Sequence, residues 1–416
     1  MIPVPSQTGI SEGFLRPSDG VVLDGVGSGV GRGGVNWRDQ CYRVMGDKLV
    51  RIEADSSIVE LGDVTGSERV TLDYSFDYLG VVADNRFYLW NVENGLREVV
   101  DPDLGNVFDF IWVDGYFMLT DGEFLIVTEL TDPFRIEPTK YGSSEADPDP
   151  IKALLKVRNE PYALNRYTIE VFDNVGGTGF PFQRVDGAQV MRGTIGTHTC
   201  CVFLESVAFV GGGRGESLSI WLVSSGSSIR ISTREIDIVL AGYSELTLSR
   251  AVLEPRVDKG HQFLYLHLPD QTLVYDGAAS QILGEPVWFK LTTSLTEFGR
   301  YRARDFVWCY DEWLCTDPQS FNFGHLNPMT GEHWGEEISW QFDTVILYNE
   351  NMGAIFHKVE LTALTGRTQL AVDTAISTEY SLDGEFYSTP RFISPCLLYT
   401  SPSPRDGLLP RMPSSA

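Results

Sequence analysis

The sequence has no long apolar run. Its longest apolar stretches fall far short of the roughly 18 consecutive apolar residues that a membrane-spanning helix needs. Residues 1–5 are not a basic segment followed by an apolar one, so no secretory signal peptide is visible. We therefore expect a soluble protein that is made in a cytoplasm. Whole-chain disorder is excluded, because 43% of the 416 residues are hydrophobic and 12% are aromatic.

Basic residues are scarce. Lys and Arg number 32 against 57 Asp and Glu, which gives a formal net charge of −25. Nucleic-acid binders contact phosphates through clustered Lys and Arg, so this composition disfavours a simple nucleic-acid binder. It fits a protein that must not adhere to DNA, although an ordinary acidic surface is the simpler explanation.

Paired cysteine motifs are missing as well. None of the cysteines forms a C-x-x-C pair, and two of them are adjacent, which is poor geometry for a disulfide. The two that flank a predicted hairpin are placed to face each other, but reduced buried thiols are the expectation for a cytoplasmic product. The six cysteines are Cys41, Cys200, Cys201, Cys309, Cys315 and Cys396.

Motifs of catalysis are also absent. The sequence has no Gly-x-Ser-x-Gly elbow, no phosphate-binding Gly-x-x-x-x-Gly-Lys-Ser/Thr loop and no histidine pair at zinc-hydrolase spacing. Gly29-x-Gly31-x-x-Gly34 matches a dinucleotide fingerprint in form, but no helix is predicted after it, so we interpret it as a flexible arm or loop. Residues 211–215 are interpreted as a turn. We predict no catalytic, cofactor-binding or metal-binding residues, no cofactor, and no enzyme activity.

Three weaker candidates remain. His261 and His267 are placed to lie on one face of a strand, where surface or core roles are commoner than metal binding. Glu336-Glu337 beside Trp334 and Trp340 is the most sugar-site-like spot, so a carbohydrate-active enzyme is the alternative to a function without catalysis. The acidic run at residues 145–149 is interpreted as a solvated loop rather than a calcium site.

What the sequence does contain is a series of short apolar strands joined by tight polar turns, from about residue 42 to 342. Asp114-Gly115 separates residues 108–113 from 116–120, and Asp121-Gly122 precedes a third apolar segment. Asp-Gly between alternating apolar residues is a strong hairpin signal, because both turn positions favour positive φ. Similar hairpins are predicted at residues 78–90, 263–275 and 306–315.

The hairpins recur with a regular interval. One turn per unit, taken from Gly46 to Asp311, gives a mean spacing of about 44 residues, and propeller blades run roughly 40–50. We therefore predict an all-β fold, a distorted β-propeller of about six irregular blades with an additional, truncated C-terminal β region. A β-sandwich with long loops is the alternative. The turns used are Gly46, Asn85, Gly115, Asn159, Gly212, Asp270 and Asp311.

These patterns divide the chain into four parts. Residues 1–35 are a Gly/Pro-rich N-terminal arm, 36–345 the propeller, and 346–395 an incomplete C-terminal β region with hairpin turns. Residues 396–416 resemble the translation of a sequencing adapter and are expected not to be native. Within the propeller, the capping-box pattern Ser232-Thr233-Arg234-Glu235 predicts one helix.

Three stretches resemble the packaged-DNA stabilisation proteins of short-tailed bacteriophages, the tail accessory factors that form the tail hub below the portal. The first runs from Tyr42 to Leu49 and continues over residues 61–70. The second is the helix opening at residues 231–236. The third covers residues 261–276, with Trp288 later, and the three follow one another in the family's order.

The resemblance implies a structural virion protein and no enzyme. Members resemble distorted β-propellers, form a hexameric ring under the portal and its adaptor, help to retain packaged DNA until ejection, and dock tail fibres or spikes and the tail needle. Further copies of the chain, the portal and adaptor proteins, and the fibre, spike or needle proteins are thus the implied partners. DNA would pass without sequence-specific binding, no membrane is involved, and the location is the virion tail after synthesis in the host cytoplasm.

Overall fold

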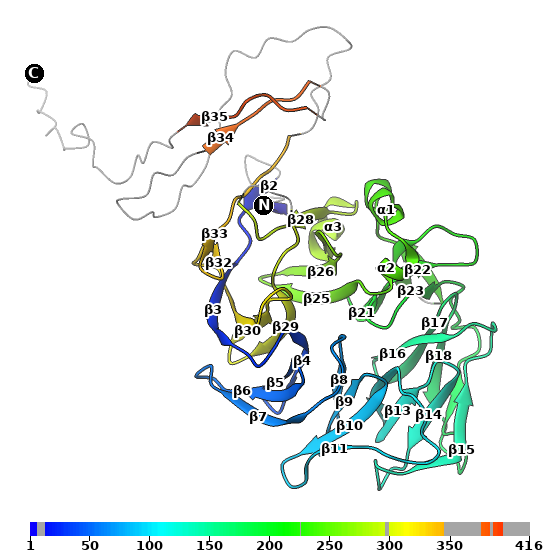
Figure 1. Ribbon diagram of the computed structural model, residues 1–416. Coiled ribbons are helices and arrows are strands. Elements are labelled where there is room, and N and C mark those ends of the chain that lie inside the picture. Colours follow the sequence, from blue (N-terminus) through cyan, green and yellow to red (C-terminus); the bar gives the residue numbers. More distant parts are fainter. Residues whose placement is uncertain (6–12, 225, 296–298, 345–375, 383–385, 394–416) are drawn as a thin grey trace, which may run out of the picture. The chain divides into compact units, whose positions relative to one another are not determined.

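The computed structural model describes residues 1–5, 13–224, 226–295, 299–344, 376–382 and 386–393. The chain divides into two compact units, Met1–Gln341 and Phe342–Ala416. The first unit is a seven-bladed β-propeller, whose sheets follow one another around a ring (Figure 1). No helix in the described part of the chain is long and apolar enough to cross a membrane.

Each blade is a small antiparallel sheet built from consecutive strands. The first blade consists of β4 (Gly31–Trp37), β5 (Gln40–Met45), β6 (Lys48–Ile52) and β7 (Ile58–Asp63). The second consists of β8 (Thr71–Tyr74), β9 (Leu79–Ala83), β10 (Arg86–Asn91) and β11 (Gly95–Glu98). The third consists of β12 (Asp109–Val113), β13 (Tyr116–Thr120), β14 (Phe124–Thr128) and β15 (Ile136–Ser143). The fourth blade consists of β16 (Ile151–Val157), β17 (Glu160–Asn165), β18 (Ile169–Asn174) and β19 (Phe182–Arg184). The fifth consists of β20 (Gly193–Thr194), β21 (Cys200–Phe203), β22 (Ser206–Gly212), β23 (Ser219–Ser224) and β24 (Ser227–Arg230). The sixth consists of β25 (Val252–Asp258), β26 (His261–His267), β27 (Thr272–Asp276) and β28 (Trp288–Leu291).

The seventh blade closes the ring by joining both ends of the propeller. It pairs β29 (Arg304–Cys309), β30 (Glu312–Thr316) and β31 (Asn322–Asn327) with β3 (Gly20–Val26), followed by β32 (Glu332–His333) and β33 (Glu336–Glu337). The innermost strands of successive blades, with β21 in the fifth blade, contact one another in a closed series, including β29 against β4. Strand β3 comes from the beginning of the chain and pairs with β31 near the end of the propeller. This pairing closes the ring.

The N-terminal segment therefore differs from the arm expected from its Gly and Pro content. Residues 1–35 contain β1 (Ile2–Pro5), β2 (Gly13–Arg16) and β3, and they begin β4. Their glycines permit close packing: a Cβ on Gly25 would lie 2.7 Å from the Phe323 ring, and one on Gly31 would lie 2.3 Å from Thr316. Here glycine marks closely packed strands and not a flexible loop.

The blade count is seven, where the turn spacing predicted about six. The turns used for that spacing do not occupy equivalent positions: Gly46 and Asn85 join second to third strands, whereas Gly115 and Asn159 join first to second strands. In six of the seven blades the first two strands are joined by two residues that both have positive φ, the geometry that suits the twist of a hairpin. These pairs are Arg38-Asp39, Asp114-Gly115, Arg158-Asn159, Leu204-Glu205, Lys259-Gly260 and Tyr310-Asp311.

The hydrophobic core is divided into seven clusters, one at each contact between neighbouring blades. Between the second and third blades, for example, Phe87, Phe110 and Phe117 pack with ring centroids 5.0–6.1 Å apart. A blade in the ring is thus covered on both faces. This explains why strands such as β9 and β13 are buried along their whole length instead of alternating between buried and exposed positions.

Buried carboxylates tie the innermost strands of neighbouring blades together. Asp109 on β12 accepts hydrogen bonds from the Leu154 backbone N–H on β16 (2.8 Å) and from the Thr71 hydroxyl on β8 (2.7 Å). Glu254 on β25 accepts from the backbone N–H groups of Asp305 (3.1 Å) and Phe306 on β29. Each carboxylate occupies a position where the backbone of the next blade has a free donor, so it satisfies that donor and fixes the spacing of the blades.

Three short helices accompany the fifth and sixth blades: α1 (Arg234–Ala241), α2 (Glu245–Leu248) and α3 (Gly277–Leu283). The predicted helix α1 is confirmed, but its cap differs from the expected box. Thr233 is the N-cap and makes no side-chain capping bond. Ser232 instead accepts from the Ile220 backbone N–H (3.2 Å) and donates to Asp237 (2.6 Å), so it fastens the start of the helix to β23.

In the second unit the structure describes one antiparallel pair, β34 (Ile376–Thr378) with β35 (Arg391–Ile393). An isolated bridge joins Ser381 to Tyr387. Residues 346–375 of the expected C-terminal β region and the adapter-like residues 396–416 lie outside the described residues.

Candidate functional site

The structure brings the two candidate histidines onto one face of β26, but not into a metal site. The His261 ring stacks on Phe263, and the His267 ring stacks on Tyr265. His261 Nδ1 lies 2.5 Å from the carboxylate of Asp276, which also caps α3. Among the described residues, no group of three or more His, Cys, Asp or Glu side chains could hold a metal ion.

The sugar-site-like spot is dispersed. Glu336 and Glu337 are adjacent exposed residues of β33, so their side chains point to opposite faces. Trp334 is buried and donates its indole N–H to the Arg302 carbonyl, whereas Trp340 is exposed. No pair of carboxylates converges there, and the alternative enzymatic function gains no supporting observation.

The remaining sequence candidates have structural roles. The dinucleotide-like glycines are part of β4 and its approach, and another strand follows, not a helix. Residues 211–215 run from the end of β22 into the turn before β23, as predicted. The described cysteines, Cys41, Cys200, Cys201, Cys309 and Cys315, are buried free thiols, and burial raises the pKa of each of them.

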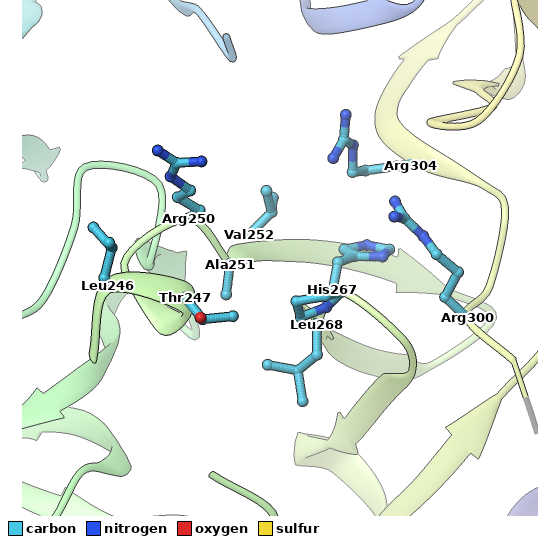
Figure 2. A pocket seen from close by; sticks show the side chains of 10 residues that line it. Leu246, Thr247, Arg250, Ala251, Val252, His267, Leu268, Arg300 and Arg304 are labelled. Atoms are coloured by element: carbon cyan, nitrogen blue, oxygen red, sulfur yellow. The ribbon is translucent and has the colours of Figure 1, made fainter. Parts of the chain in front are cut away.

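A site that the sequence analysis missed lies between the sixth and seventh blades. It is a pocket of about 370 Å³ at the end of the ring where the innermost strands β25 and β29 begin. We call it the arginine pocket and define it by Arg250, Arg300, Arg304 and His267. Figure 2 shows the three guanidinium groups and the imidazole around one hollow. Its floor and walls include Leu246, Thr247, Ala251, Val252, Leu268 and Pro269.

Three separate parts of the fold supply the charged groups. Arg250 follows α2, Arg304 is the first residue of β29, and Arg300 lies in the segment that leads into that strand. The backbone here is extended, so alternate side chains face opposite ways. Arg302, between the other two, binds the buried carboxylate of Asp317 instead, with Nε–Oδ2 at 3.1 Å and Nη2–Oδ2 at 2.5 Å.

The arginines of the pocket are poorly neutralised by the protein itself. Among the described residues, no carboxylate lies within ion-pair distance of Arg250 or Arg300. Arg304 has Asp305 at 3.6 Å from its Nε, and this nitrogen makes no hydrogen bond. Burial, followed by the positive charge of Arg304, lowers the pKa of Arg300. The pocket therefore holds repelling positive charges in the absence of an anion.

The Asp305 carboxylate does not cancel this charge, because other arginines already bind it. Burial raises the pKa of Asp305, but the positive charges of Arg69, Arg304 and Arg43 outweigh that effect and hold it below its usual range. Asp305 pairs with Arg69, accepts from the Thr316 hydroxyl (2.9 Å), and offers its backbone carbonyl to Arg43 (2.8 Å). Its negative charge is shared among three guanidinium groups, which leaves the region positive.

His267 is the buried polar group of the pocket. It is 4% exposed, and neither ring nitrogen has a hydrogen-bond partner among the described residues. Its Nε2 lies 3.3 Å from Glu254, but without the alignment of a hydrogen bond. Burial lowers the pKa of His267 despite this carboxylate, so the ring is neutral at pH 7. Because Nε2 faces the Glu254 carboxylate, the neutral ring carries its proton there, and Nδ1 is left as an acceptor that does not favour an anion.

Sequence reasoning had one signal for this site. Residues 300–304 read Arg-Tyr-Arg-Ala-Arg, three arginines at alternate positions in a chain where acids outnumber bases. Their alternation predicts two on one face of an extended segment. Arg250 and His267 come from another blade, and nothing local in the sequence connects them to this segment.

The fold defines the class: an all-β protein whose closed propeller is followed by a separate C-terminal β unit, without a convergent catalytic group among its described residues. Within that class, the chain belongs to the family of bacteriophage P22 Gp10. The family's β-propeller matches residues 1–331, and its β-sandwich matches residues 339–395. The resemblance seen in the sequence is therefore confirmed, as is the expected fold of a β-propeller with an additional C-terminal β region.

Individual relatives agree with this membership. The chain is 26% identical over 398 residues to the tail hub protein gp10 of Salmonella phage P22. This alignment covers 89% of this chain and 80% of that protein. Solved structures with similar folds include the N-terminal domain of Nup159 (TM-score 0.45, 8% identity, 74% of this chain and 95% of that one). Hsv2 of Kluyveromyces lactis is another (TM-score 0.40, 10% identity, 70% and 95%).

Proposed function

We propose that this chain is a subunit of a phage tail hub, located in the virion tail, that closes the portal channel and helps to retain packaged DNA. Membership of the P22 Gp10 family over both the propeller and the sandwich carries the proposal. The tail hub protein gp10, aligned over most of both chains, supports the same role. The protein is thus proposed to act by contact and not by catalysis.

The finer parts of the role concern its partners. We extend the proposal to a hexameric ring that binds the portal and its adaptor on one side and docks tail fibres or spikes and the needle. A closed propeller suits this role because several of its outer strands are short: β11 has 4 residues and β19 has 3. Short edges limit uncontrolled strand pairing, while the turns at both ends of the blades remain free for specific contacts.

The net negative charge of the chain is also part of this proposal. If carboxylates line the channel of the ring, DNA would pass without adhering to the wall. Once the ring has been imaged, reversing the charge of the carboxylates that face its channel is expected to slow DNA ejection or alter retention. Unchanged ejection kinetics would count against this part of the proposal and would leave ring assembly untouched.

The experiment that tests the hub itself is reconstitution. The full chain is mixed with the cognate portal and adaptor proteins, and the product is imaged by electron microscopy for a sixfold ring. In parallel, phage that lack the gene are complemented in trans, and the DNA content of their heads is measured. A chain that stays monomeric in the presence of the portal, with heads that hold DNA without it, would refute the proposed function.

A further inference from the structure

We propose that the arginine pocket binds a phosphate group, carried either by free phosphate or pyrophosphate or by the backbone of a nucleic acid. Arg250, Arg300 and Arg304 provide the positive charge, and the buried Nε of Arg304 provides a donor without a hydrogen-bond partner among the described residues. The inference concerns the isolated propeller and does not depend on the hub function. Its first support is that, among the described residues, Arg250 and Arg300 have no carboxylate within ion-pair distance, in a chain where acids outnumber bases by 57 to 32.

This excess makes the unpaired arginines informative. Most described arginines elsewhere in the propeller have a carboxylate within 4 Å, including exposed ones such as Arg158 with Glu205 and Arg214 with Asp147. Surface pairs of this kind form readily where acids are abundant. Two guanidinium groups that face one pocket without such a partner are therefore best explained by an anion from outside the chain.

The geometry favours a tetrahedral oxyanion over a carboxylate. A carboxylate is planar, has two oxygens, and is satisfied by a single bidentate arginine. Here three guanidinium groups approach from separate elements: the end of α2, the segment before β29, and β29 itself (Figure 2). A phosphate group presents oxygens in several directions, so it suits donors that come from separate elements better than a planar carboxylate does.

The charge of the pocket points the same way. Burial, followed by the positive charge of Arg304, lowers the pKa of Arg300. The Nε of Arg304 is a buried donor without a hydrogen-bond partner among the described residues, which is costly. A bound phosphate would offset the repulsion between the two guanidinium groups and could accept from this donor.

The test measures binding of sodium pyrophosphate, sodium phosphate and a single-stranded oligodeoxynucleotide to the purified full chain by isothermal titration calorimetry. Arg300→Gln is expected to weaken binding by about tenfold or more, because a charge-assisted hydrogen bond is removed from a partly desolvated site. Arg250→Gln should weaken it as well, and this exposed residue can be changed without a risk to folding. Arg234→Gln is the matched control: it removes one exposed guanidinium on α1, outside the pocket.

The outcomes separate the sources of the phosphate. If pyrophosphate binds and competes with the oligonucleotide, the pocket recognises the phosphate group itself, whichever molecule carries it. If only the oligonucleotide binds, the phosphate that the pocket recognises is that of a nucleic-acid backbone. Three results would overturn the proposal: no binding of any probe, an equal loss in Arg300→Gln and Arg234→Gln, or tighter binding of an oligoglutamate peptide than of pyrophosphate with the same dependence on Arg300. None of these results bears on ring assembly, which is measured separately.

Discussion

The pH dependence of propeller stability should depend on Asp109, because this carboxylate is buried between three blades. It accepts hydrogen bonds from Thr71 and Leu154, yet no positive side chain contacts it. Burial raises its pKa from 3.8 to about 7. The hydrogen bonds from the two neighbouring blades oppose this shift without cancelling it.

The sign follows from proton linkage. Between pH 3.8 and about 7 the carboxyl is protonated in the folded chain and ionised in the unfolded chain, so the unfolded state binds fewer protons. The free energy of unfolding therefore falls as the pH rises, by about 1.4 kcal/mol per unit where the difference is complete. Integrated over the two pKa values, the loss from pH 5 to pH 7 is about 2 kcal/mol.

Asp109→Asn isolates this contribution. An amide can accept from the Leu154 N–H through its oxygen and donate to the Thr71 hydroxyl through its nitrogen, so the link between blades is kept while the titration is removed. Urea unfolding of both chains, followed by tryptophan fluorescence at pH 5, 6 and 7, gives the two profiles. The variant should gain about 2 kcal/mol relative to the parent over this range, since other titrating groups cancel in the difference. Parallel profiles would refute the assigned shift.

Two further changes test the ring closure and its buried charge. Gly324→Ala should lower the free energy of unfolding by about 1–3 kcal/mol, because a Cβ there would lie 1.8 Å from the backbone of β3. The control Gly105→Ala has nothing within 4 Å of its Cβ and should change this free energy by less than about 0.5 kcal/mol, so equal urea midpoints for the two variants would contradict the closure. Asp305→Asn should cost about 3–5 kcal/mol at pH 7, because Arg69 and Arg304 lose a buried carboxylate. The pKa of Asp305 is depressed in the folded chain, so its stabilisation is complete above the unfolded value of 3.8 and is lost only as the pH falls from there through the lower folded value. Thermal melts of parent and variant should therefore show a constant gap from pH 7 to about 5 and a gap that begins to narrow below 3.8, and a gap that already closes above pH 5 would contradict the assignment.

The strands and many of the turns could be predicted from the sequence because their determinants are local. Asp114-Gly115 and Asp84-Asn85 adopt the positive φ that the hairpin pattern requires. The Leu204-Glu205 turn carries no such signal: it has the same backbone geometry with residues that rarely favour it. In this turn the twist and register of the flanking strands determine the conformation, and a propensity argument could not find it.

Ring closure could not be predicted from the sequence either, because it depends on strands that are far apart in the chain. Strand β3 pairs with β31 from Gly20↔Asn327 to Val26↔Asn322, across about three hundred residues of intervening chain. Its sequence Gly-Val-Val-Leu-Asp-Gly-Val is suited to a strand, but glycines around it suggested a loop. Those glycines lie against the strands and rings of the partner sheets, a constraint that exists only once the chain has folded.

The arginine pocket shows why net charge alone does not decide whether this chain binds an anion. A charge of −25 is a sum over the whole chain, whereas binding depends on the groups near the ligand. At physiological ionic strength the Debye length is about 8 Å, so most exposed carboxylates are screened from a ligand inside the pocket. The half-buried Arg300 is screened less, and it has no carboxylate partner among the described residues. The distribution of charge, and not its sum, decides whether this acidic propeller accepts an anion.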